Sequence, residues 1–178
     1  PKSGHQWDSV FYADVDFAFC REGGGDAKYI WDIARQDYLI DCAVAFRLTG
    51  NEVYSRQIVR WVQSWIAANP YMDGIHWSSA IEVAVRSLNW LWGYQLCRHE
   101  NFLSAEEHLV WIKAFYQHAA FLHRHVSYYF SPNNHIIVEV AQESPFFLAL
   151  IWCWVQAAAS PASQYILLAC RAVSFQVA

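Results

Sequence analysis

The sequence predicts an all-α protein, and three observations carry that prediction. Apolar residues recur at helical spacing along almost all of the chain after residue 26. Helix-ending residues follow the periodic stretches, as Gly50 and the pair Asn69-Pro70 do. No segment shows the apolar–polar alternation of a strand flanked by hairpin turns. Because the links between helices are short, we expect antiparallel helical hairpins.

The chain divides into a short lead-in and one helical domain. Residues 1–25 are aromatic and acidic and end in three consecutive glycines, which predicts an irregular segment. Residues 26–178 form the expected helical domain. Its first helix is expected over about 27–48, since one face carries Ile33, Ile40, Val44 and Leu48.

The same pattern predicts four further helices and a candidate sixth. Residues 51–68 carry an apolar face that ends at Asn69, and residues 78–98 carry another. Ser104 and Glu107 have the spacing of a capping box, which predicts a helix start there. A fifth helix is expected to begin near Asn134, and residues 161–177 are a candidate sixth helix.

Composition excludes several classes of function. The chain has 178 residues and a net charge of −4, with 12 basic and 16 acidic side chains, so we expect no nucleic-acid partner. Its longest apolar run, 146–155, is too short to cross a bilayer; a membrane segment over 146–173 is the lesser alternative. Five cysteines without a C-x-x-C pair, and histidines without an H-E-x-x-H pattern, predict no disulfide framework, no metal and no other cofactor.

Aromatic residues are abundant, with 10 Trp, 10 Tyr and 11 Phe. We expect part of this set to build the core. The remainder is suited to line a groove, because flat rings stack well on the faces of sugars.

The first candidate site is the segment 131–139, Ser-Pro-Asn-Asn-His-Ile-Ile-Val-Glu. An asparagine at a helix start supplies an amide donor beside unpaired backbone N–H groups, which suits an anion. His135 titrates near neutrality, and Glu139 is placed one turn later to orient its ring. The structural alternative is that Asn133 or Asn134 caps the helix and His135 pairs with Glu139.

The second candidate is the segment 74–79 and the helix that follows it. Ser79, Glu82, Arg86, Asn89 and Gly93 form one polar stripe on the side opposite Ile81, Val85, Leu88 and Trp92. Glu82 and Arg86 are spaced for an ion pair. On spacing alone the stripe is an ordinary solvated face, although the chain has few charges elsewhere.

The third candidate is the stretch 26–35, a helix start that brings together Lys28, Trp31 and Arg35. Cationic and aromatic side chains in one cluster hold an acidic sugar by charge and stacking. The alternative is an amphipathic first turn without a ligand.

Taken in this order, the motifs resemble the N-terminal helical domain of the heparinase II/III-like polysaccharide lyases, which include heparan-sulfate lyases and related alginate lyases. The resembling segments are D-A-K-Y-I-W-D-I-A-R at 26–35, F-R-L-T-G-N at 46–51, W-S-S-A-I-E-V-A-V-R at 77–86 and S-P-N-N-H-I-I-V-E at 131–139.

The resemblance implies an incomplete (α/α) toroid of antiparallel helical hairpins, followed by β-sandwich material that this chain lacks. It implies a periplasmic or secreted enzyme that cleaves a uronate-containing acidic polysaccharide by β-elimination. Asn134 would neutralise the uronate carboxylate, and His135 would act as a base or a substrate contact. Further substrate contacts would come from Lys28, Trp31, Arg35, Trp77, Glu82, Arg86, Asn133 and Glu139. The alternative function is a non-catalytic sugar-binding or helical scaffold domain.

Overall fold

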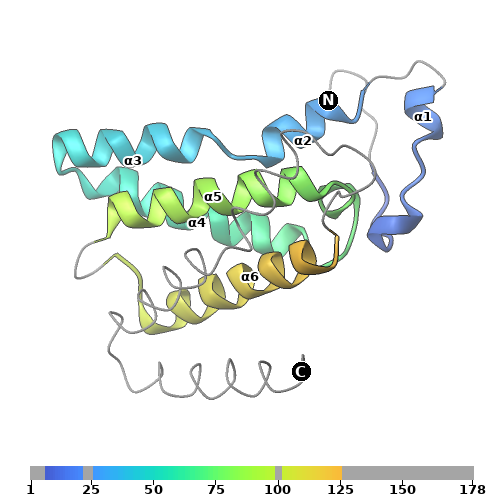
Figure 1. The fold of residues 1–178 in the computed structure, drawn as a ribbon. Coiled ribbons are helices and arrows are strands. Elements are labelled where there is room, and N and C mark those ends of the chain that lie inside the picture. Colours follow the sequence, from blue (N-terminus) through green and yellow to red (C-terminus); the bar gives the residue numbers. More distant parts are fainter. Residues whose placement is uncertain (1–6, 22–25, 99–101, 126–178) are drawn as a thin grey trace.

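The computed structural model describes residues 7–21, 26–98 and 102–125, and this part of the chain is helical (Figure 1). The all-α prediction is therefore confirmed. Within the described residues the only β-type pairing is an isolated antiparallel bridge between Phe11 and Asp73. The helices are α1 (Ala18–Arg21), α2 (Lys28–Ala34), α3 (Tyr38–Thr49), α4 (Glu52–Ala68), α5 (Ala80–Cys97) and α6 (Ala105–Arg124), with short 3-10 turns η1 (Tyr12–Asp14) and η2 (Ile75–Trp77).

Consecutive helices from α3 to α6 run in opposite directions, as the short connections predict (Figure 1). Helix α5 occupies the centre of this arrangement and packs against α3 on one side and α6 on another. Closure into an incomplete toroid stays a prediction. The fifth and sixth expected helices, from Asn134 and over 161–177, lie outside the described residues.

The single helix expected over 27–48 is wrong, because the chain breaks between α2 and α3. Gln36 adopts a positive φ of 57° although it is not glycine, and it is buried. Two hydrogen bonds from α5 hold the break: Trp90 Nε1 donates to Gln36 Oε1 at 2.9 Å, and Asn89 Nδ2 donates to the Arg35 carbonyl at 2.9 Å. These tertiary contacts offset the strain of the left-handed conformation.

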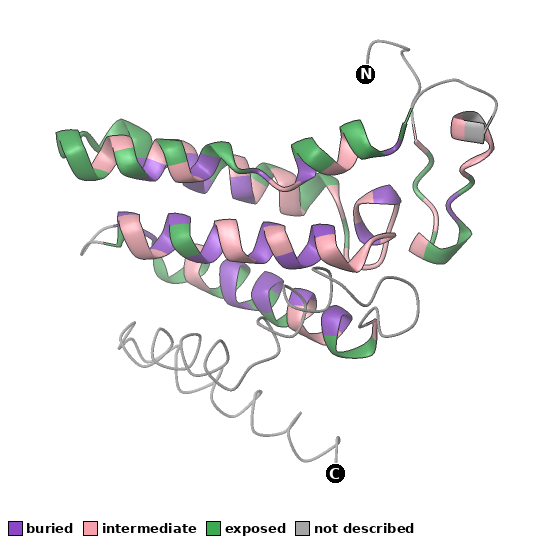
Figure 2. Ribbon diagram, turned by 45° about the horizontal axis from the view of Figure 1, so that its top comes forward, coloured by how far each residue is buried: buried purple, intermediate pink, exposed green. Residues whose placement is uncertain are grey.

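The expected apolar face of this region is also wrong. Ile33 is 68% exposed and Leu48 is 82% exposed, whereas Leu39 and Ala43 are fully buried. Figure 2 shows the exposed side of α3 as a green band facing away from α5. The break after α2 shifts the helical register, so residues that share a face in one continuous helix do not share it here.

The helix ends follow the local signals in the sequence. Gly50 closes α3 in the left-handed conformation, with φ at 68°, and Asn51 caps α4 by accepting a hydrogen bond from Val53 N at 3.0 Å. Ser104 and Glu107 form both bonds of the expected capping box, at 2.7 and 3.2 Å. These ends were predictable because each one depends on residues a few positions apart.

Replacing Ser104 by alanine should lower the free energy of unfolding by about 1 kcal/mol, because the N–H of Glu107 loses its acceptor. Urea denaturation of both proteins measures the difference. The matched control is Ser64→Ala, since the exposed Ser64 hydroxyl only donates to a carbonyl of its own helix. A loss at Ser104 no larger than the loss at Ser64 would show that the capping box contributes nothing.

Aromatic side chains build much of the core, as their number predicts. Trp90 and Trp111 are fully buried between α5 and α6, and Phe115 lies beside them with ring centroids 6.2 Å from each. A second cluster joins Trp77 to Phe121, with centroids 5.4 Å apart. These clusters bury one side of α5, and the candidate site lies on that side.

Candidate functional site

The polar stripe of α5 is buried, not solvated. Glu82 and Arg86 are 3% and 0% exposed, and Gly93 is buried where α3 and α4 approach, with Leu39 and Ile58 close to it. The expected apolar side of α5 is the more open one, since Trp92 is 57% exposed. The assignment of the stripe to solvent is therefore wrong, because other elements supply partners for its polar groups.

Glu82 pairs with Arg35, the residue that directly follows α2. Arg35 Nε and Nη2 donate to the two carboxylate oxygens of Glu82 at 2.6 and 2.8 Å, a bidentate arrangement. Arg35 also lies 3.2 Å from the carboxylate of Asp32 on its outer side. Hydrogen bonding to Glu82 raises the pKa of Arg35, and this outweighs the lowering by burial. The expected Glu82–Arg86 ion pair is wrong: Glu82 uses both oxygens to join α2 to α5.

Arg86 is a buried cation whose direct partners are neutral. Its Nε donates to His118 Nε2 at 3.0 Å, and its two terminal nitrogens approach the His76 carbonyl at 3.4 Å. The guanidinium carbon lies 4.1 Å from the ring centre of Trp65 and 5.4 Å from that of Trp77. Burial lowers the pKa of Arg86 to about 9, and the charge of Glu82 acts in the opposite direction.

Two neutral histidines complete this buried centre. The carbonyl of Ala114 lies 2.7 Å from His118 Nδ1, which therefore carries the proton and leaves Nε2 as the acceptor for Arg86. Burial, and then the charge of Arg86, lower the pKa of His118 well below its usual value. The same two causes lower the pKa of His76 to about 4.

Several polar atoms around Arg86 have no hydrogen-bond partner among the described residues. They are Trp65 Nε1, His76 Nδ1 and Trp77 Nε1. At neutral pH the centre thus holds a positive charge in aromatic surroundings with unpartnered polar atoms. Trp65, Arg86 and His118 come from α4, α5 and α6, so three helices meet at this centre.

Sequence reasoning missed His118 as part of this site. The signal was present, because His118 continues the spacing of Trp111, Phe115 and Leu122 on the buried face of α6. A histidine on such a face needs a polar partner in the core. Arg86 on the neighbouring helix meets that need.

The free energy of unfolding should fall as the pH drops from about 6.5 towards 4. His76 has a folded-state pKa of about 4 against 6.5 in the unfolded chain, so only the unfolded chain takes up this proton in that window. Uptake of this one proton contributes about 1.4 kcal/mol per pH unit to the slope, in addition to the contribution of His118, whose pKa is also lowered. Denaturation at several pH values, for the wild type and for His76→Gln, measures the contribution. An unchanged slope in the variant would contradict the assignment.

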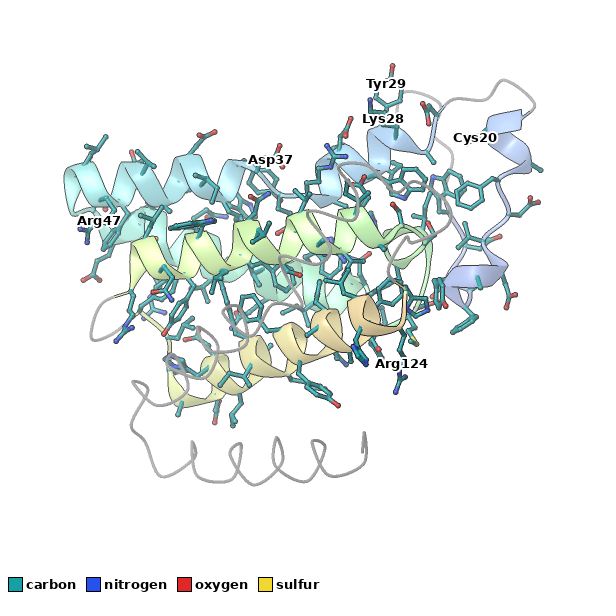
Figure 3. All side chains as sticks on the ribbon, viewed as in Figure 1. Cys20, Lys28, Tyr29, Asp37, Arg47 and Arg124 are labelled. Carbon is teal, nitrogen blue, oxygen red and sulfur yellow. The ribbon has the colours of Figure 1, made fainter. Side chains whose placement is uncertain are left out.

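The three predicted contacts on α2 take different positions. Lys28 is exposed and projects outward beside Tyr29 (Figure 3). Trp31 is half-buried, and its Nε1 donates to the carbonyl of Ile75 at 3.1 Å. Arg35 points inward to Glu82. Of these three, Lys28 is the cation that remains open to a ligand from solvent.

On α5 and the turn before it, the structure brings Trp77, Glu82 and Arg86 into the interior, where their contacts are with other parts of the chain. The remaining predicted site residues, Asn133, Asn134, His135 and Glu139, lie outside the described residues. Their roles stay predictions.

Two classes of site are absent from the part of the chain that the structure describes. It contains no group of three or more histidine, cysteine, aspartate or glutamate side chains placed to hold a metal ion. None of its helices has both the length and the apolar character needed to cross a membrane.

Comparison with known proteins identifies the family. No curated protein and no solved structure matches the chain. A family model, described as "Heparinase II/III N-terminus", matches residues 4–145. This range includes all four resembling segments and residues 4–25 of the lead-in, part of which packs against α2. The chain therefore belongs to the heparinase II/III N-terminal domain family.

Proposed function

We propose that this chain is the helical part of a polysaccharide lyase that cleaves a uronate-containing acidic glycan by β-elimination. The observation that carries the proposal is the family match, which extends through the segment 131–139 with its Asn-Asn-His sequence. The net charge of −4 does not oppose an acidic ligand if a cation is available locally, as Lys28 is on the exposed side of α2.

The chemistry needs a group that neutralises the substrate carboxylate. Removing the C5 proton of a uronate places negative charge next to an ionised carboxylate, and a hydrogen-bond donor there stabilises the enolate. The C4–O bond then breaks, an acid protonates the leaving oxygen, and a C4=C5 double bond remains. In this proposal Asn134 donates to the carboxylate, and His135 acts as a base or a contact, with Asn133 and Glu139 beside them.

The buried residues have a supporting role in the proposal. Arg86, with no exposed surface, holds the turn that contains His76 and Trp77 by its carbonyl contact and its position over the rings. Glu82 holds Arg35 and thereby α2, which carries Lys28 and Trp31. We therefore assign Trp77, Glu82 and Arg86 to positioning, and Lys28 and Trp31 to contact with the glycan.

The antiparallel helices are the beginning of an incomplete (α/α) toroid, and a β-sandwich in the same protein completes the catalytic cleft. A uronate polysaccharide is found outside the cytoplasm, so the protein acts in the periplasm or after secretion.

The test is formation of an unsaturated product. Each polysaccharide of a panel that contains heparan sulfate, alginate and other uronate chains is incubated with the protein, and absorbance in the near ultraviolet is followed. At least one substrate should give a rising signal. Saturable binding without any product across the panel would instead support a non-catalytic sugar-binding domain.

A further inference from the structure

A cavity of about 270 Å³ lies between the lead-in and the segment that precedes α5. Residues 7–9 form one wall, Asn69 at the end of α4 forms another, and Asp73 to His76 close it. Its volume is near the lower end for ligand clefts, about 300 Å³. The cavity therefore has room for one small ring, and the other sugars of a chain would lie outside it.

Backbone contacts hold the walls of this cavity in place. The lead-in pairs with the 72–74 segment, since Tyr12 N donates to the Met72 carbonyl at 3.0 Å and Gly74 N donates to the Val10 carbonyl at 2.7 Å. Trp31 ties the next residue, Ile75, to α2 through its indole N–H. A ligand would thus meet a preformed site, which lowers the entropic cost of binding.

The lining has the composition of a site for hydroxyl groups. Asp8 and Asp73 supply carboxylate oxygens, and Asp73 Oδ2 already accepts from the Ser9 hydroxyl. Asn69 donates its amide N–H to the Trp65 carbonyl at 2.8 Å, so its side-chain oxygen is the group left to accept. Hydroxyl donors suit these acceptors, and the indole of Trp7 is suited to pack on a sugar ring.

The charge of the cavity lining determines which kind of sugar can bind. Among the described residues that line the cavity, two are carboxylates and none is lysine or arginine. His76 is the remaining titratable group in the lining, and its lowered pKa keeps it neutral at neutral pH. Like charges brought together without a counterion are strongly unfavourable. A uronate carboxylate or a sulfate should therefore bind more weakly than a neutral sugar.

We propose that this cavity binds a single pyranose unit that carries no negative charge. It binds the neutral sugar of a glycan, whereas the chemistry assigned to Asn134 acts on the acidic unit. The inference rests on the proposed function only in taking the ligand to be part of a glycan.

The experiment measures direct binding to the full chain. Isotopically labelled protein is titrated with N-acetylglucosamine and, separately, with glucuronate, and the indole N–H signals are followed by NMR. The Trp7 signal is identified by its loss in Trp7→Phe. We expect saturable shifts of that signal with N-acetylglucosamine, and affinity lower by about tenfold or more for glucuronate.

Variants separate stacking from charge. Trp7→Ala should weaken binding of the neutral sugar by roughly tenfold, whereas Trp7→Phe, which keeps a ring, should retain most of it. Asp8→Asn with Asp73→Asn should remove the discrimination against glucuronate. The control is Trp92→Ala, since Trp92 is exposed on α5 and does not line the cavity; its affinities should equal those of the wild type.

Three results would overturn the inference. They are no saturable binding of N-acetylglucosamine, equal binding of glucuronate by the wild type, and a response of Trp7 to calcium ions but not to sugar. Cleavage of polysaccharides is assayed separately. A protein that binds the neutral sugar but cleaves nothing would remove the proposed lyase function and leave this inference intact.

Discussion

Replacing Glu82 by glutamine should lower the free energy of unfolding by about 3 kcal/mol, one of the two largest effects that we expect in this chain. Glutamine keeps the size of the side chain but removes the only carboxylate bonded to Arg35 in a bidentate geometry. Breaking a buried ion pair on one side costs about 3–5 kcal/mol. We take the lower limit because the Arg35 side chain is 30% exposed and regains some water.

A second consequence adds to this loss. Arg86 is fully buried, and the charge of Glu82 is what opposes the lowering of its pKa by burial. Without that charge, the buried guanidinium has only neutral partners, so its desolvation is less well compensated. The variant should therefore lose protons from Arg86 at lower pH than the wild type does.

Chemical denaturation at pH 7 measures the effect, with Asp32→Asn as the matched control. Asp32 also pairs with Arg35, but its side chain is 45% exposed, so its loss should cost less than about 1 kcal/mol. A double-mutant cycle of Glu82→Gln with Arg35→Met isolates the pairwise interaction. Equal losses for Asp32→Asn and Glu82→Gln would show that burial does not increase the contribution of the Glu82–Arg35 pair to the free energy of unfolding.

The sequence predicts those features of the fold that depend on neighbouring residues. Gly50 and the Ser104–Glu107 box act within a few positions, so the C-terminal end of α3 and the start of α6 were predictable. The break at Gln36 was not, because its partner Trp90 lies 54 residues further along the chain. No local pattern marks a glutamine in the left-handed conformation.

The candidate site, like the fold, could be predicted only where it depends on neighbouring residues. Helical periodicity identifies the two faces of α5 but does not say which one is buried, and apolar content favoured the wrong one. The decision rests on partners far away in sequence: Arg35 is 47 residues from Glu82, and His118 is 32 residues from Arg86. The small number of charged residues elsewhere in the chain was the one observation that correctly argued against an ordinary solvated face.

Replacing Asn134 by aspartate should abolish turnover while leaving the melting temperature nearly unchanged. The reason is that aspartate caps a helix about as well as asparagine, so a purely structural role predicts little effect. If Asn134 donates to the substrate carboxylate, aspartate removes the donor and adds a like charge. Loss of one such donor lowers the rate by roughly a hundredfold or more, and the repulsion adds to that.

The measurement is product absorbance on the polysaccharide that the wild type cleaves best, with the melting temperature recorded in parallel. The control is Asn51→Asp, because the structure shows Asn51 capping α4 through Val53 N, remote in sequence from the 131–139 segment. That substitution should leave both quantities unchanged. Near-normal turnover in Asn134→Asp would show that Asn134 only caps a helix. Asn133→Asp would then be measured in the same way. Equal loss of turnover in Asn51→Asp would show that a new charge at a helix start is harmful in itself, with no need for a carboxylate-binding asparagine.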